Sequence, residues 1–304
     1  MAGEATARID VTPIRAVAVD DVGDPCGVPV LFVHGTPDSR LGRHPDDGVA
    51  SRAGVRLLAV DRPGIGLSDV DPAATVASVA ADHLAVADHF DIERFAVLAW
   101  SAGALPAVAL AAAAPGRVAA VGIAAGLVPI DAFADPEVRA AADPSRVGFV
   151  DLARELPPEQ LAVEVDPFLV PDPVDTDLAR ELVLEAADAR RRAELEAVPG
   201  AVDQLAAAMV EAVRTGRAGL RADLAAQATP LSRSGVDLAA VRAPVRLWYG
   251  EHDPVAPPAF GRWWAGRLAT AQLEVLPGAS HAFPLVHWSR LLVELAAELR
   301  SGPE

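Results

Sequence analysis

Short apolar runs that alternate with helical stretches constrain the fold of this chain more than any other feature. The first five runs are Ile14–Val19, Val28–Val33, Val55–Val60, Phe95–Ala99 and Val118–Ala124. Helical patterns separate them near residues 45–53, 75–90 and 102–114. Runs that are apolar on both faces are typical of central strands in a parallel sheet. The alternation therefore predicts an α/β fold, with a mostly parallel central sheet and helices on both faces.

A long central segment interrupts this pattern. Between Leu127 and Val241 there is no convincing strand, and prolines separate helical stretches, of which residues 177–197 form the longest. The α/β pattern returns at Val245–Tyr249 and Gln272–Leu276, and an amphipathic helix closes the chain. We therefore expect an α/β core built from residues 1–126 and 241–304, with a helical cap, or lid, inserted at residues 127–240.

Composition and charge exclude several classes of protein. Apolar residues make up 52% of the 304 positions and charged residues 22%, which is typical of a folded globular chain. The formal net charge of −16 argues against nucleic acid or an anionic membrane as a partner. Cys26 is the only cysteine, so the chain cannot form an internal disulfide or a cysteine-rich metal site. Because no phosphate loop, dinucleotide motif or metal-ligand spacing occurs, we expect no cofactor and no metal.

Two segments bear on the predicted location. Met1–Asp10 contains acidic residues and no apolar block, unlike a signal peptide. The uncharged stretch Phe95–Gly116 has the length of a membrane span, but Ser, Gly and Pro interrupt it, and a buried strand, turn and helix explain it equally well. We expect a cytoplasmic protein, monomeric or homodimeric, whose partner is a small-molecule substrate.

Reactive residue types follow four of the predicted strands. His34, Ser101, Asp253 and His281 each lie just beyond the carboxyl end of a strand. In an open parallel sheet these ends meet at one crevice. A nucleophilic serine needs a base, and the base needs a carboxylate to fix its tautomer. The sequence therefore predicts a Ser, Asp and His site at this edge of the sheet.

Five motifs, each at a predicted strand end, give the chain a family resemblance. They are His34-Gly35-Thr36-Pro37, Asp61 to Ser68 (DRPGIGLS), Ala99-Trp100-Ser101-Ala102-Gly103, Gly250-Glu251-His252-Asp253-Pro254 and Gly278-Ala279-Ser280-His281. In this order they resemble the α/β-hydrolase superfamily, and within it the serine hydrolases and esterases that carry a cap. The chain departs from the Gly-x-Ser-x-Gly pattern at Ala99, which adds a single methyl group, so we still expect the sharp turn to form.

The resemblance implies roles for individual residues. Ser101 would be the nucleophile and His281 the base. Asp253 would be the acid, with Asp131 as an alternative because some members of the family place the acid after the preceding strand. The backbone N–H groups of Ala102 and Thr36 would form the oxyanion hole.

Fewer features point to the substrate. Trp100 and Phe283 are candidate substrate-binding residues, since they are close in sequence to the nucleophile and the base. Arg190–Arg192 lie on a cap helix, where we expect them to be solvated. Few positive charges then remain near the strand ends, which favours an uncharged substrate.

The resemblance implies a serine hydrolase that cleaves a carboxylic ester, lactone or thioester of small to medium size through an acyl-enzyme. Three alternatives stay open because a fold does not fix a function. A carbon–carbon bond hydrolase and a hydroxynitrile-lyase-type enzyme would use the same three residues. A non-hydrolytic synthase or ligand-binding protein would use only the scaffold.

Overall fold

One eight-stranded sheet runs through the centre of the protein in the order β1-β2-β4-β3-β5-β6-β7-β8. The structure is a computed structural model that describes residues 6–301. The strands are β1 Ala7–Thr12, β2 Arg15–Gly23, β3 Val28–Val33, β4 Val55–Val60, β5 Phe95–Trp100, β6 Val118–Ala124, β7 Val245–Gly250 and β8 Ala271–Leu276. The β1–β2 and β2–β4 pairs are antiparallel and the other pairs are parallel, which confirms the expected mostly parallel sheet.

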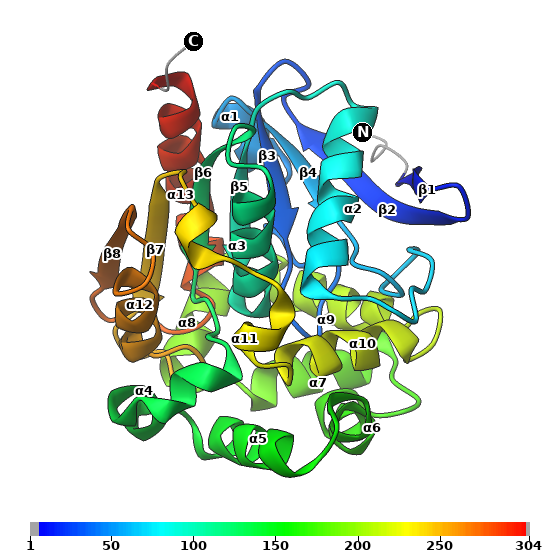
Figure 1. The fold of residues 1–304 in the computed structure, drawn as a ribbon, viewed down its shortest axis with the longest axis vertical. Helices are drawn as coiled ribbons and strands as arrows, with labels where there is room; N and C mark the ends of the chain where they lie inside the picture. Colours follow the sequence, from blue (N-terminus) through cyan, green and yellow to red (C-terminus); the bar gives the residue numbers. More distant parts are fainter. Residues whose placement is uncertain (1–5, 302–304) are drawn as a thin grey trace.

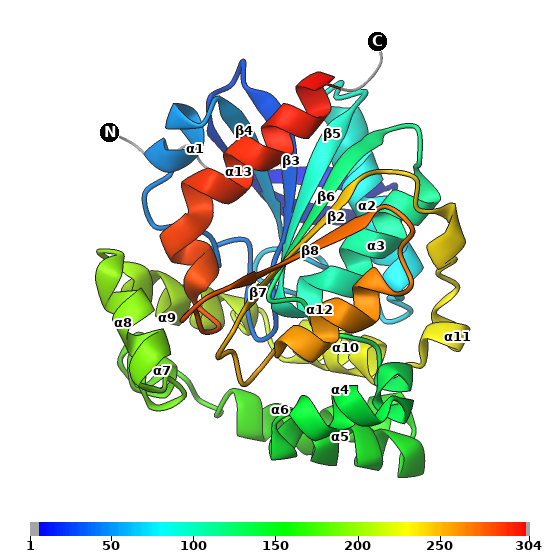
Figure 2. The same ribbon diagram turned by 90° about the vertical axis from the view of Figure 1, so that its left-hand side faces the viewer.

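Helices cover both faces of the sheet, as expected (Figure 2). One face carries α1 (Gly48–Arg52) and α13 (Phe283–Ser301). The other carries α2 (Val76–His89), α3 (Ala104–Ala113) and α12 (Pro258–Ala265). All six residues of β5 are buried, because this central strand is covered from both sides. Their apolar character is therefore a consequence of the two-sided covering.

The segment between β6 and β7 forms a group of helices in which no strand is described; we call residues 125–244 the helical insert. Its helices are α4 Pro136–Ala141, α5 Pro144–Glu155, α6 Pro158–Leu169, α7 Thr176–Glu185, α8 Ala189–Ala197, α9 Ala201–Ala212, α10 Ala218–Gln227 and α11 Leu231–Ser234. They gather at the bottom of Figure 1, at the end of the sheet where the parallel strands finish. The predicted lid, residues 127–240, corresponds to this insert in sequence.

Two local elements differ from the sequence expectation. The edge strand β1 is missed by hydropathy because Ile9 is its only buried residue, and its partner β2 begins at Arg15. The expected single helix over residues 177–197 is wrong: α7 ends at Glu185 and α8 begins after Asp188. The Asp188 carboxylate accepts hydrogen bonds from the Arg190 and Arg191 N–H groups, so it starts a new helix.

The two segments that bear on location can be followed only in part. Residues 1–5 of Met1–Asp10 lie outside the described residues, and residues 7–10 belong to β1. The uncharged stretch 95–116 contains β5, a short turn and α3. Across residues 6–301, no helix is both long enough and apolar enough to span a bilayer.

Candidate active site

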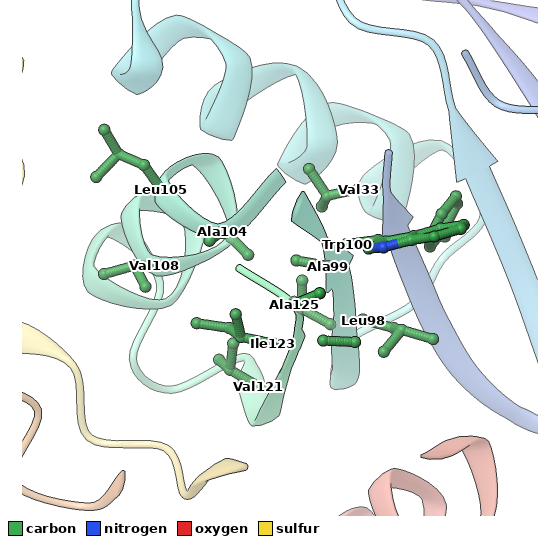
Figure 3. Close-up of a cluster of buried hydrophobic side chains, with 14 of the residues drawn as sticks. Val33, Leu98, Ala99, Trp100, Ala104, Leu105, Val108, Val121, Ile123 and Ala125 are labelled. Atoms are coloured by element: carbon green, nitrogen blue, oxygen red, sulfur yellow. The ribbon is translucent and has the colours of Figure 1, made fainter. Parts of the chain in front are cut away.

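Ser101 lies on a sharp turn between β5 and α3. Its φ of 56° is in the left-handed region, which costs a non-glycine residue about 1–3 kcal/mol. The turn fits because β3 passes close by and Gly103 has no side chain: a Cβ there would lie 2.3 Å from the Val33 carbonyl oxygen. Ala99 is fully buried beneath the turn, beside Ala104 and Val33 (Figure 3). The methyl group that departs from the family pattern is therefore accommodated in the core.

His281 and Asp253 are joined by a hydrogen bond from the loops that follow β8 and β7. The distance between His281 Nδ1 and Asp253 Oδ2 is 2.7 Å. Asp253 Oδ1 also accepts the N–H groups of Val255 and Ala256, at 2.8 and 3.0 Å. A buried carboxylate with these partners holds the imidazole with its Nε2 free to accept a proton. The alternative acid Asp131 is exposed on the insert, and its only described partner is the Ser232 N–H at 3.4 Å.

A cavity of about 110 Å³ brings the nucleophile and base candidates to one place. Ser101, His281 and Trp100 line it from the sheet domain. Phe283 does not line this cavity, which corrects the expectation of a substrate contact there. The physical reason is its position as the first residue of α13, where its side chain is fully buried in the hydrophobic core.

The loop after β3 supplies the other wall of the cavity. Thr36 lines it, and no acceptor for the Thr36 N–H occurs among residues 6–301. Ala102 is the second residue of the turn after β5, where amides lack an acceptor within the helix. The loop is fixed by Arg62, whose guanidinium donates to the carbonyl oxygens of His34 and Gly35. Arg62 is thus a structural residue. Of the two oxyanion-hole candidates, Thr36 lines the cavity, whereas Ala102 does not line it but directly follows Ser101, which does.

The sequence pattern of the Alpha/beta hydrolase family matches residues 30–295, which is most of the chain. The chain belongs to the alpha/beta hydrolase family.

Two relatives with similar sequences and one solved structure with a similar fold are described as esterases. Rhodomycin D methylesterase DnrP of Streptomyces peucetius is 28% identical over 309 residues, which cover 95% of this chain and 99% of the relative. Rhodomycin D methylesterase DauP of Streptomyces sp. (strain C5) is 27% identical, with the same coverage. A thermophilic esterase from Thermogutta terrifontis has a similar fold, with a TM-score of 0.68, 21% identity and coverage of 97% of this chain and 98% of that one. These findings support a hydrolytic enzyme that acts on esters.

Residues of the helical insert that were not site candidates in the sequence complete the cavity of this hydrolase. Val183 of α7, Arg191 of α8, and Leu205 and Met209 of α9 line it. Leu205 and Met209 are four residues apart, which places them on one face of a helix, and this spacing is a weak signal that could have pointed to them. The expectation that Arg190–Arg192 are all solvated is wrong for Arg191, because the break at Asp188 sets the rotation of α8.

Two donors of the cavity wall lack acceptors within residues 6–301. The Trp100 indole is 5% exposed, and its Nε1–H has no partner. The Arg191 Nε–H is buried without a partner, and its Nη1 reaches only the Ala186 carbonyl oxygen, at 3.5 Å. Burial lowers the pKa of Arg191, with opposing contributions from Asp253 and Glu194. A bound group that accepts hydrogen bonds would satisfy such donors.

Asp38, directly after the His34–Pro37 motif, also lines the cavity. Burial raises the pKa of its carboxyl group to about 7, against the opposing effects of the Ser39 N–H and Arg62. Nearby, burial and then Arg62 hold the pKa of His34 well below its usual range. The neutral His34 ring donates from Nδ1 to the Gly35 carbonyl oxygen at 2.9 Å and is structural.

Other features of the hydrolase do not compete with this site. A larger open hollow of about 430 Å³ lies at Asp88, Asp91, Ile92, Glu93 and Arg117, and none of these residues is a serine, cysteine or histidine. Within residues 6–301, no group of three or more His, Cys, Asp or Glu residues is arranged to hold a metal ion.

Proposed function

We propose that this chain is a serine hydrolase that cleaves carboxylic esters through an acyl-enzyme, with Ser101, His281 and Asp253 as its triad. The observation that carries the proposal is the 2.7 Å contact between His281 and Asp253 beside a cavity that Ser101 also lines. The esterase relatives support the same class of reaction. Residues 127–240 are proposed as the lid over this site, and residues 1–126 and 241–304 as the catalytic core.

The mechanism follows from the groups around the cavity. His281 Nε2 accepts the Ser101 hydroxyl proton while Ser101 Oγ bonds to the ester carbonyl carbon. The Ala102 and Thr36 N–H groups donate to the oxyanion. The C–O bond to the alcohol then breaks, and the alcohol leaves with the proton from His281. Water attacks the acyl-enzyme, loses a proton to His281, and the acid departs as Ser101 regains its hydrogen.

The first test compares the wild type with Ser101→Ala on p-nitrophenyl esters from acetate to decanoate. We expect kcat to fall by about 10⁴-fold or more in the variant, because removal of the nucleophile leaves only the oxyanion hole and binding. Asp253→Asn should lower kcat by about 10³- to 10⁴-fold, since it removes the acceptor that fixes the His281 tautomer. Asp131→Asn is the matched control. A Ser101→Ala protein with undiminished turnover would contradict the proposal.

The cavity predicts the size of the substrate. Its volume of about 110 Å³ is below the roughly 300–1,000 Å³ of sites for drug-sized ligands. We therefore expect the highest kcat/KM for short acyl groups or for small leaving groups. Methyl esters belong in the first panel, since two relatives are described as methylesterases. A preference for decanoate over acetate would require the insert to move away from the site.

Arg191 lines the cavity, and its positive charge favours a substrate with an anionic group over the expected uncharged one. Monomethyl glutarate and methyl pentanoate are matched in length and differ in one terminal carboxylate. If Arg191 binds an anionic acyl part, kcat/KM for monomethyl glutarate divided by kcat/KM for methyl pentanoate should fall about 10-fold or more in Arg191→Gln. Arg190→Gln, an exposed neighbour, is the control. If the ratio does not change, the uncharged class is retained.

A further inference from the structure

Glu194, on helix α8 of the helical insert, contacts the backbone on both sides of His281. Its Oε1 accepts the Ser280 N–H at 2.6 Å, and its Oε2 accepts the Ala282 N–H at 2.9 Å. Each carboxylate oxygen thus holds one amide, and His281 is the residue between the two amides. Glu194 lies 86 residues from Ser280 and 88 residues from Ala282 in sequence, so only the fold brings its side chain to these amides.

The Glu194 carboxylate is half-buried and lies at the start of a helix, and both features strengthen its contact with the two amides. Ala282 directly precedes α13, so the carboxylate lies at the start of a 19-residue helix, where a negative charge is favourable. Burial raises the pKa of Glu194, while the two backbone N–H groups oppose that effect. Figure 2 shows α8 beside the first turn of α13, on the side of the molecule where the insert meets the sheet domain. A half-buried carboxylate with two charge-assisted hydrogen bonds restrains the segment that it contacts.

The His281 side chain is fixed at its ring by Asp253, but its backbone belongs to a loop. Gly278, with a φ of 72°, precedes this loop, and the Ser280 hydroxyl is buried with no partner in the part of the chain described. The start of the loop is held by Glu251, whose Oε2 accepts the Gly278 N–H, and by the His252 N–H, which donates to the Ala279 carbonyl oxygen. Among residues 6–301, the side chain that contacts the two amides next to His281 is that of Glu194. Catalysis by a general base depends on placing its nitrogen within hydrogen-bond reach of the nucleophile.

We propose that Glu194 is a positioning residue through which the helical insert sets the place of His281 relative to Ser101. This inference rests on the proposed serine hydrolase function. In this proposal the insert has two roles: its residues line the cavity, and Glu194 positions the base His281. Displacement of α8 would release both amides at once, so an open insert would leave the base less well placed.

The test uses the full-length protein and three variants. Glu194→Gln keeps the shape but replaces one acceptor by an NH₂ group, so it retains at most one of the two hydrogen bonds. Glu194→Ala removes both. Glu196→Gln makes the same change of charge at an exposed position of α8 and is the matched control. The readouts are kcat and KM on a short p-nitrophenyl ester, the rate of Ser101 labelling by a fluorophosphonate, and the thermal midpoint.

We expect kcat and the labelling rate to fall about 10-fold in Glu194→Gln and up to about 100-fold in Glu194→Ala, with little change in KM. Glu196→Gln should match the wild type. A purely structural role would change the thermal midpoint and leave kcat per folded molecule intact, which would overturn the inference. Unchanged labelling in both Glu194 variants, with the wild type labelled normally, would overturn it as well. A wild type that is not labelled at Ser101 would overturn the serine hydrolase proposal itself and this inference with it.

Discussion

At the scale of single residues, neighbouring groups fix the backbone conformation of Ser101 and the ring tautomer of His281. Ser101 keeps a left-handed backbone because Gly103 leaves room for β3, and His281 keeps one tautomer because Asp253 accepts its Nδ1–H. The sequence singles out Ser101, Asp253 and His281 as candidates, because each of them follows a predicted strand. The prediction that Phe283 contacts substrate rested on its nearness in sequence to His281. That nearness does not determine where the side chain points, because Phe283 begins a helix.

Asp38 gives a prediction of pH dependence. The unfolded chain loses the Asp38 proton near pH 4, whereas the folded protein keeps it until about pH 7. Between these values the folded state binds more protons, so this group's contribution to stability is complete below about pH 4 and is lost as the pH rises through about 7. Asp38→Asn should therefore gain about 2 kcal/mol of unfolding free energy over the wild type at about pH 8, and little at about pH 4.

Urea unfolding at the two pH values measures this difference. Asp10→Asn, at an exposed position of β1, controls for the loss of one negative charge. An Asp38→Asn gain of equal size at both pH values would contradict the assigned cause, because a packing effect does not depend on the titration of the group.

At the scale of elements, the strands could be predicted far better than the helical insert. The bounds of β3, β4 and β6 agree with the apolar runs because strands covered on both faces contain almost no polar residue. The break between α7 and α8 was missed, because Asp188 within a charged, periodic stretch is also compatible with one long helix. That break rotates Arg191 and Glu194 toward the site, so the contribution of the insert to the site could not be predicted.

The cap of α8 can be tested directly. Asp188→Ala removes the acceptor for the Arg190 and Arg191 N–H groups and should lower the unfolding free energy by about 1 kcal/mol. It should also lower kcat, because Arg191 and Glu194 lie on this helix. Asp143→Ala removes the corresponding cap of α5, which has no residue at the cavity, and should change stability without changing kcat. Equal effects of the two variants on kcat would argue against a role for the α8 start in the site.

At the scale of the whole molecule, buried ion pairs connect the helical insert to the sheet domain. Arg40 is 5% exposed and contacts Asp20 of β2, Asp61 after β4 and Glu211 of α9, at 2.9, 2.7 and 2.6 Å. A second pair across the same boundary joins Arg62, after β4, to Asp223 of α10. The contacts join segments up to 171 residues apart, and no local pattern predicted them. The ion pairs hold the insert on the sheet domain in addition to its buried apolar side chains, which belong to the same hydrophobic core as the sheet.

Replacement of Arg40 measures the strength of this connection. Arg40→Met would leave three buried carboxylates without their shared cation and should lower the unfolding free energy by about 3–5 kcal/mol. Arg52→Met breaks an exposed pair with Asp46, in which the side chains are 65% and 56% exposed, and should cost less than about 1 kcal/mol.

Burial already raises the pKa of Asp61 to about 6, against the opposing effect of Arg40. Without Arg40 that pKa rises further, so the cost should be larger at about pH 8 than at about pH 5. Urea unfolding of both variants at the two pH values would contradict this connection if Arg40→Met were no more destabilising than Arg52→Met.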